Sequence, residues 1–146
     1  MIRTDKRLRI CYFLIAVTLI FIWGNSLLPA EISQAFSDWV KKLLSALFSG
    51  GGSGTGQGSG LLRKIAHFTE FAVLGTLFGW CFGMLQKPKY LPFLFGTAAA
   101  CVDETLQMLA PGRAPRLTDV LIDSFGVLTG LMLLYLGHHY CKKKHT

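Results

Sequence analysis

Charged residues are scarce in this sequence. Asp, Glu, Lys and Arg make up 16% of its 146 residues, while 51% are hydrophobic and the mean hydropathy is positive. An ordinary soluble domain carries about 25% charged residues, and a disordered chain is poorer in apolar residues. The shortage of charge therefore excludes both classes and indicates a small integral membrane protein.

Cysteines are few and are poorly spaced for cross-linking or metal binding. We expect Cys11, Cys81 and Cys141 near the cytoplasmic end of the predicted helices and Cys101 in mid-span, away from an oxidising exterior. No two form a CxxC pair, so we interpret them as small buried hydrophobic residues. The sequence also has no visible Ser-His-Asp order, phosphatase signature or zinc-ligand spacing, which gives no support to those enzyme classes.

Long apolar runs are what the sequence does have. Four segments, residues 9–28, 61–85, 91–109 and 118–140, approach the ~20 residues that cross about 30 Å of hydrocarbon as a helix. A signal peptide is a competing interpretation of the first segment, but no small-x-small cleavage site follows it. We therefore predict an all-α, polytopic membrane protein with four transmembrane helices in a single domain, residues 1–146.

The basic residues predict the topology, because Lys and Arg near the ends of spans are retained in the cytoplasm. With both termini inside, nine basic residues lie on the cytoplasmic side and six outside. We therefore predict a multi-pass protein with cytoplasmic termini. The formal charge of +7 then reflects this topology, and we expect no nucleic-acid partner.

The chain between the first two spans has a different pattern. Residues 31–48 place Ile32, Trp39, Val40 and other apolar side chains at helical spacing, which predicts an extracellular amphipathic helix. Such a helix lies on the membrane surface or packs on the transmembrane bundle, and both placements fit the pattern. Residues 49–60, SGGGSGTGQGSG, are predicted to form a flexible tether, whether native or an engineered insertion.

Polar residues of the predicted spans converge at one depth, the outer leaflet. His67 and Glu70 lie three residues apart on one helical face near the outer end of the second span. The third span, the following loop and the fourth span add Asp103, Glu104, Gln107, Arg113, Arg116, Asp119 and Asp123. Each charged residue inside a span costs about 2.5–3.5 kcal/mol, so these groups have to be paired, hydrated or bound to a ligand.

Two interpretations of this convergence stay open. In the first, Arg113, Arg116 and His67 neutralise the carboxylates in a self-contained structural network. In the second, which the excess of carboxylates favours, the residues bind a ligand. The surplus negative charge suits a divalent cation, a cationic ligand or a shared proton. A divalent cation is therefore the candidate cofactor, with no ligand set assigned.

Glycines at four-residue spacing predict close helix packing below this region. They are Gly75, Gly79 and Gly83 in the second span and Gly126 and Gly130 in the fourth. Small residues let helix backbones approach closely where lipid provides no hydrophobic drive for association. We therefore interpret the apolar half of the bundle as a scaffold.

Two stretches, KIAHFTEF and DETLQMLAPGRAPRLTDVLIDSFG, resemble the signature of the VanZ-like membrane proteins. The resemblance covers most of the chain. The matching positions are Lys64, His67, Phe68, Glu70, Asp103, Glu104, Gln107, Gly112, Arg113, Asp119 and Gly126. Phe71 and Asp123 depart from the pattern, which has Tyr and Asn at these positions, and Asp123 adds a carboxylate that alters what the site binds.

The resemblance implies a bacterial cell-envelope protein that acts at the outer membrane face, with teicoplanin or other glycopeptide susceptibility as one consequence. It implies no particular reaction. One hypothesis is a binding protein, surrounded by membrane lipid, for a lipopeptide or glycopeptide antibiotic or a cell-wall precursor. Its predicted ligand-binding residues are Lys64, His67, Glu70, Glu104, Gln107, Arg113, Arg116, Asp119 and Asp123.

The alternative is a membrane enzyme that acts on a lipid-linked substrate at the outer leaflet. Arg113 and Arg116 would then hold a phosphate or carboxylate. The candidate catalytic residues, which would handle protons, are His67, Glu70, Asp103, Glu104 and Asp119. A transporter fits less well, because four spans are few and the apolar half of the bundle lacks polar residues.

Overall fold

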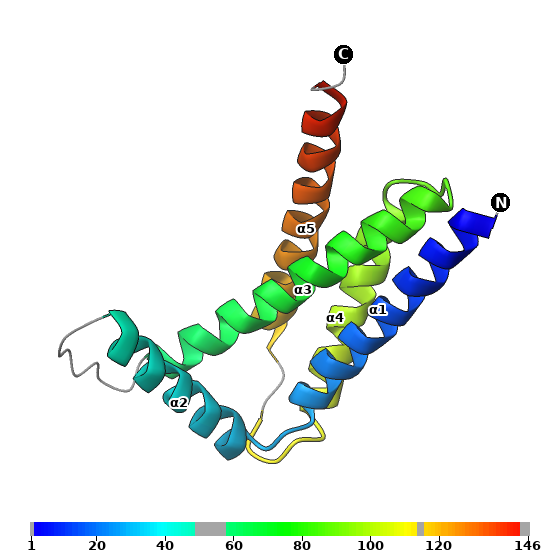
Figure 1. Cartoon of the computed structure of the whole chain (residues 1–146). Helices are drawn as coiled ribbons and strands as arrows, with labels where there is room; N and C mark the ends of the chain where they lie inside the picture. Colours follow the sequence, from blue (N-terminus) through cyan, green and yellow to red (C-terminus); the bar gives the residue numbers. More distant parts are fainter. Residues whose placement is uncertain (1, 49–57, 114–115, 144–146) are drawn as a thin grey trace.

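The computed structural model describes residues 2–48, 58–113 and 116–143, and helices account for nearly all of them (Figure 1). The helices are α1 (Ile2–Ser26), α2 (Ala30–Phe48), α3 (Gly58–Met84), α4 (Leu91–Gln107) and α5 (Leu117–Lys143). The described residues contain no strand, which agrees with the predicted all-α class. Most of the predicted tether lies outside the described residues, and its last three residues, 58–60, instead begin α3.

Three helices are long and apolar enough to cross a membrane. The segments that qualify are Asp5–Ser26, Gly60–Met84 and Leu117–Tyr140. The predicted third span, residues 91–109, is shorter than expected, because α4 has 17 residues and ends at Gln107. Its length of about 26 Å falls below the ~30 Å hydrocarbon core. After Gln107 the chain forms turns and then reaches Pro111 and Gly112. The backbone φ of Gly112 is +76°.

The helices alternate in direction, so their polar ends meet. In Figure 1 the first residues of α1 and the last residues of α5 lie at one end of the bundle. Helix α2 and the loop that follows α4 lie at the opposite end. The backbone N–H of Ala30, at the start of α2, donates to the carbonyl of Pro111 in that loop at 3.2 Å. The end of the bundle away from the termini therefore gathers the ends of α1 and α4 and the starts of α3 and α5.

Helices α3 and α5 approach closely because glycines lie between them. A Cβ at Gly130 would collide with the carbonyl of Ala72, and a Cβ at Gly126 would collide with the carbonyl of Phe68. The Thr76 hydroxyl donates to the Gly130 carbonyl at 3.1 Å across this contact. Around it lie the fully buried side chains Ile22, Phe71, Leu74, Ala100 and Val127.

The predicted role of the glycines is correct for most positions but wrong for Gly83. A Cβ at Gly75 would meet the backbone of Val127, whereas a Cβ at Gly83 would meet nothing within 4 Å. Gly79 faces only the flexible ends of Leu131 and Leu134. The helices diverge toward this end of the bundle (Figure 1), so a close approach there is not needed.

The cysteine prediction holds for two residues and fails for one. Cys11 and Cys81 are buried, but Cys101 is exposed. The buried face of α4 carries Ala99, Ala100 and polar residues, and Cys101 lies on another face of the same helix. The side chain of Cys141 lies outside the described residues.

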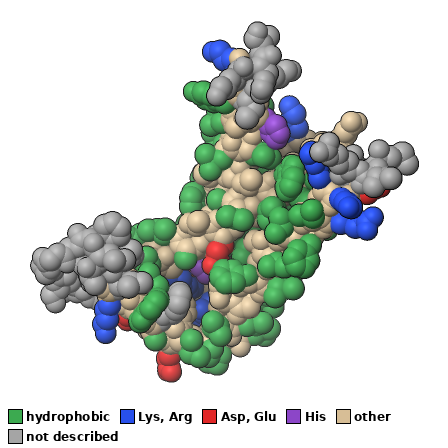
Figure 2. All heavy atoms as spheres, viewed as in Figure 1, with side chains coloured by type: hydrophobic (Ala, Val, Ile, Leu, Met, Phe, Trp, Pro, Cys, Tyr) green, Lys and Arg blue, Asp and Glu red, His purple; other side chains and the backbone are tan. Residues whose placement is uncertain are grey.

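Much of the exposed surface is apolar, as expected for a protein that contacts lipid. Figure 2 shows hydrophobic side chains over most of the visible face. On α1, Phe13 and Ile20 are among the most exposed hydrophobic residues. On α2, Ile32 and Trp39 are exposed and Val40 is half-buried. The interfacial placement of α2 stays a prediction.

Candidate functional site

A cluster of buried polar side chains occupies the end of the bundle away from the termini. We call it the polar cluster, and it consists of His67, Glu70, Asp103, Glu104, Gln107 and Asp123. Asp103 is fully buried, and Gln107 and Asp123 are each 1% exposed. The α4 members share the buried face of that helix because Gln107 follows Glu104 by three residues and Asp103 by four. They meet His67 and Glu70 from α3 and Asp123 from α5.

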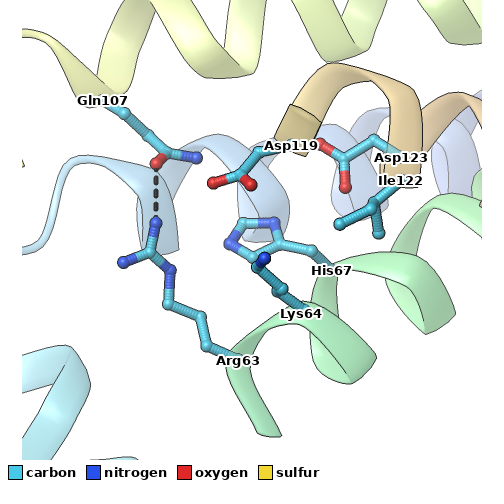
Figure 3. Close-up of a pocket in the computed structure, with 7 residues that line it drawn as sticks. All are labelled: Arg63, Lys64, His67, Gln107, Asp119, Ile122 and Asp123. Carbon is cyan, nitrogen blue, oxygen red and sulfur yellow. Dashed lines mark hydrogen bonds between the residues drawn. The ribbon is translucent and has the colours of Figure 1, made fainter. Parts of the chain in front are cut away.

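Gln107 connects a cation to a carboxylate inside the cluster. Nη2 of Arg63 donates to Oε1 of Gln107 at 2.9 Å, drawn as the dashed line in Figure 3. Nε2 of Gln107 donates to Oδ2 of Asp103 at 3.0 Å. Arg63 is therefore linked to Asp103 through a neutral amide.

His67 lies between two carboxylates without forming a hydrogen bond to either. Its Nδ1 atom is 3.8 Å from Oε2 of Glu70 and 3.9 Å from Oδ2 of Asp103. The other oxygen of Glu70 accepts a hydrogen bond from Nδ2 of Asn25 at 3.4 Å. Nδ1 of His67 and Oε2 of Glu70 are both buried and have no partner.

The arginines do not neutralise the carboxylates in the way that a self-contained network requires. Arg113 donates to the carbonyls of Ser26 at 3.2 Å and Asn25 at 3.4 Å, at the end of α1. Arg116 contacts Glu104 through its backbone N–H, not through its guanidinium. Burial, with the nearby Arg63 charge, lowers the pKa of Arg113 from its ordinary value. The described residues thus give little support to the structural-network interpretation.

A cationic cavity of about 210 Å³ lies beside the cluster. Four basic residues line it, which are Arg63, Lys64, Arg113 and Arg116. Asp119 is the acidic residue in its lining. The excess of positive charge suits a phosphate or carboxylate, which guanidinium groups bind through paired hydrogen bonds.

An apolar groove of about 540 Å³ runs between α1, α2 and α3. Its apolar lining residues are Phe21, Leu28, Ile32, Val40, Leu62, Ile65 and Ala66. His67, Glu70, Arg63 and Arg113 also line the groove. Figure 2 shows acidic, basic and histidine side chains within a hollow among hydrophobic ones. Arg63 and Arg113 thus border both the apolar groove and the cationic cavity.

A third cavity is much smaller, at about 10 Å³. Figure 3 shows its lining, to which α3 contributes Arg63, Lys64 and His67, α4 contributes Gln107, and α5 contributes Asp119, Ile122 and Asp123. This volume corresponds to about one water molecule. The cavity therefore suits a water or a single ion, not an organic ligand.

Eight of the nine predicted ligand-binding residues line at least one of these three cavities. They are Lys64, His67, Glu70, Gln107, Arg113, Arg116, Asp119 and Asp123. Glu104, the ninth, and the catalytic candidate Asp103 line none of the three and lie in the buried part of the polar cluster. Their roles in binding or catalysis stay predictions.

Arg63 and Asn25 are not among the residues predicted from the sequence, yet both belong to the site. Arg63 lines all three cavities, and Asn25 donates to Glu70. The signal for Arg63 was its spacing, because it precedes His67 by four residues and Glu70 by seven, on one helical face. For Asn25 the only signal was that it is a polar residue at the end of an apolar run.

Comparison with known proteins gives one match. The family model described as VanZ/LLP1 matches residues 9–138. No curated protein and no solved structure matches the chain. The matched range includes α3, α4 and most of α5, and with them every residue of the polar cluster.

Proposed function

Because the chain belongs to the VanZ/LLP1 family, we propose that it is a bacterial cell-envelope protein that binds an anionic amphiphile at the outer leaflet. The two ligands of this chemistry that concern the cell wall are a lipid-linked cell-wall precursor and an acylated glycopeptide antibiotic. Binding either one would limit the access of a teicoplanin-type antibiotic to its target. Resistance to such antibiotics follows from binding, without a chemical step.

The observation that carries this proposal is the pair of arginines shared by two cavities. Arg63 and Arg113 border both the apolar groove and the cationic cavity. An acyl or isoprenoid chain in the groove would bury apolar area, which is favourable by about 25 cal/mol per Å² relative to water. Its phosphate or carboxylate would then lie beside the arginines. A ligand that has only one of these two parts would leave the other cavity unused.

The proposal includes the topology predicted from the basic residues. Helix α4 crosses the membrane as a short fourth span, both termini lie in the cytoplasm, and the polar cluster lies at the outer leaflet. This placement gives lipid-linked precursors and externally added antibiotics access to the groove.

Binding to the purified protein in lipid nanodiscs tests the proposal. We expect a lipid-linked precursor or the acylated antibiotic to bind at least tenfold more tightly than the same molecule without its chain. Ala66→Phe, which fills the groove from α3, should weaken binding of the acylated ligand at least tenfold. Ala98→Phe, at an exposed position of α4, is the matched control and should have no effect. Equal affinity for acylated and deacylated ligands would contradict the proposal.

A second candidate function is an enzyme that acts on the same class of lipid-linked substrate. It is favoured by Glu70, which lines the apolar groove and whose buried Oε2 atom has no hydrogen-bond partner. Such a carboxylate can accept a proton from a bound substrate or water. Mass spectrometry of the lipid-linked ligand after incubation separates the two functions. Conversion that is lost in Glu70→Gln while binding is kept supports the enzyme, and an unchanged ligand supports binding alone.

A further inference from the structure

We propose that His67, Asp103 and Asp123 form a binding site for a divalent transition-metal cation, best matched by Zn²⁺. Each residue offers one ligand atom, and these atoms all lie within 4.8 Å of one another. They come from α3, α4 and α5, so three separate helices bring them together. This site does not depend on the proposed amphiphile.

Buried polar atoms without partners favour a cation at this place. Oδ1 of Asp103, Oδ1 of Asp123 and Nδ1 of His67 are buried and have no hydrogen-bond partner. Asp103 is fully buried and Asp123 is 1% exposed. Leaving a buried charge without a partner costs several kcal/mol. A bound divalent cation would neutralise both carboxylates.

The basic side chains that the structure describes do not fill this role. Within the described residues, no Lys or Arg side chain forms an ion pair with Asp103 or Asp123. The nearby Arg63 donates to Gln107, and Arg113 donates to the backbone carbonyls of α1. Gln107 donates to Oδ2 of Asp103, which leaves Oδ1 free to bind a metal. Such a hydrogen bond to a metal-binding carboxylate holds its orientation.

The size of the adjoining cavity also fits an ion. His67 and Asp123 line the cavity of about 10 Å³, which has room for about one water molecule. Figure 3 shows these two side chains with Asp119 on the α3 and α5 sides of that cavity. The cavity is too small for an organic cation, so a single metal ion is the occupant that its volume favours.

The donor atoms indicate which class of metal binds. An imidazole nitrogen favours a transition metal such as Zn²⁺ over Mg²⁺ or Ca²⁺, which prefer oxygen ligands alone. Three protein ligands and an open fourth position for water are typical of catalytic zinc sites. Ligand atoms of a tetrahedral zinc ion lie about 3.4 Å apart, so small side-chain rotations complete the site.

Zinc binding to the chelator-treated, full-length protein in detergent tests this site. We expect one tightly bound Zn²⁺ per chain by isothermal titration and a rise in the unfolding temperature when Zn²⁺ is added. Asp123→Asn and His67→Gln should each weaken binding at least tenfold, because the loss of even an outer-shell partner of a metal ligand costs about 10–100-fold in affinity. Asp123→Asn keeps the shape of the side chain and removes a buried charge, so it should fold without metal.

Two controls separate this site from other zinc-binding groups. Glu31→Gln makes the same carboxylate-to-amide change at an exposed position on α2 and should leave zinc binding unchanged. The double substitution His138→Ala and His139→Ala removes two exposed histidines on α5 and should also leave the tight site intact.

Three results would overturn the proposal. They are the absence of any zinc response, unchanged binding in Asp123→Asn and His67→Gln, and loss of the tight site in the double histidine variant. A larger stabilisation by Mg²⁺ or Ca²⁺ than by Zn²⁺ would overturn the assignment to a transition metal. Size-exclusion chromatography and circular dichroism of each variant establish that it is folded before its zinc binding is compared.

Discussion

Arg63 and Gln107 lie 44 positions apart in the sequence and are joined by a hydrogen bond of 2.9 Å from the guanidinium Nη2 to the amide Oε1. The same amide donates to Asp103 at 3.0 Å. Gln107 therefore satisfies a cation with one end of its amide and an anion with the other. An amide side chain suits this position because it offers a donor and an acceptor without carrying a charge.

This arrangement makes Gln107→Leu a destabilising change. Leucine has a similar size but removes both hydrogen bonds, so Arg63 and the buried Asp103 each lose a partner. We expect the free energy of unfolding to fall by about 1–3 kcal/mol, measured by thermal or denaturant unfolding in detergent. Gln34→Leu, on the exposed surface of α2, is the control. Equal stability of the two variants would show that the hydrogen bonds through Gln107 contribute nothing net.

The glycines of α3 and α5 should differ in their tolerance of alanine. In Gly130→Ala the new Cβ meets the Ala72 backbone, which cannot move away, so we expect a large loss of stability. In Gly79→Ala it meets only flexible leucine ends, so the loss is smaller. In Gly83→Ala the new Cβ meets nothing within 4 Å, so the stability should be unchanged or rise by up to about 1 kcal/mol from helix propensity. Unfolding temperatures in one detergent give the ranking, and equal values would contradict the packing described for α3 and α5.

Arg116 offers a cleaner test of ligand binding than Arg113. The Arg116 side chain is exposed and lines the cationic cavity, while its contact with Glu104 uses the backbone N–H. Arg116→Gln should therefore reduce glycopeptide resistance and leave the amount of protein in the membrane near normal. Arg113→Gln removes hydrogen bonds to α1 and should lower both. Resistance and membrane abundance are measured together on each variant.

Lys89→Gln is the matched control for that pair. Lys89 is exposed between α3 and α4, at the end of the bundle opposite the polar cluster. Loss of the Lys89 charge should change neither the glycopeptide resistance nor the amount of protein in the membrane. Full resistance in Arg116→Gln would exclude this side chain from the activity.

Thiol labelling of intact cells tests the topology. A cysteine introduced at Ser53, in the predicted tether, should react with a membrane-impermeant thiol reagent before lysis. A cysteine introduced at Lys87, between α3 and α4, should react only after lysis. The parent chain sets the background from the native cysteines. The opposite pattern would place the polar cluster at the cytoplasmic face and remove the basis for its contact with external antibiotics.

The sequence predicted that the polar groups converge better than it predicted their hydrogen-bond partners. Each set of polar residues lies within a single helix, His67 and Glu70 in α3 and Asp103, Glu104 and Gln107 in α4. Helical periodicity was therefore enough to place each set on one face. The partners of Arg113 depend on how the end of α1 meets the loop after α4, which no local pattern encodes. The same holds for Gly83, because its spacing matches a packing motif but the divergence of the helices decides whether the motif is used.

The short length of α4 has a consequence for the surrounding bilayer. The crossing that we propose for α4 would be about 26 Å long, several ångströms shorter than the hydrocarbon core, and such hydrophobic mismatch is accommodated by local thinning of the bilayer. Headgroups and water would then reach deeper beside α4 than elsewhere around the protein. The carboxylates at its end would carry a smaller insertion cost, and the chain would partition into thinner membrane regions in preference to thicker ones.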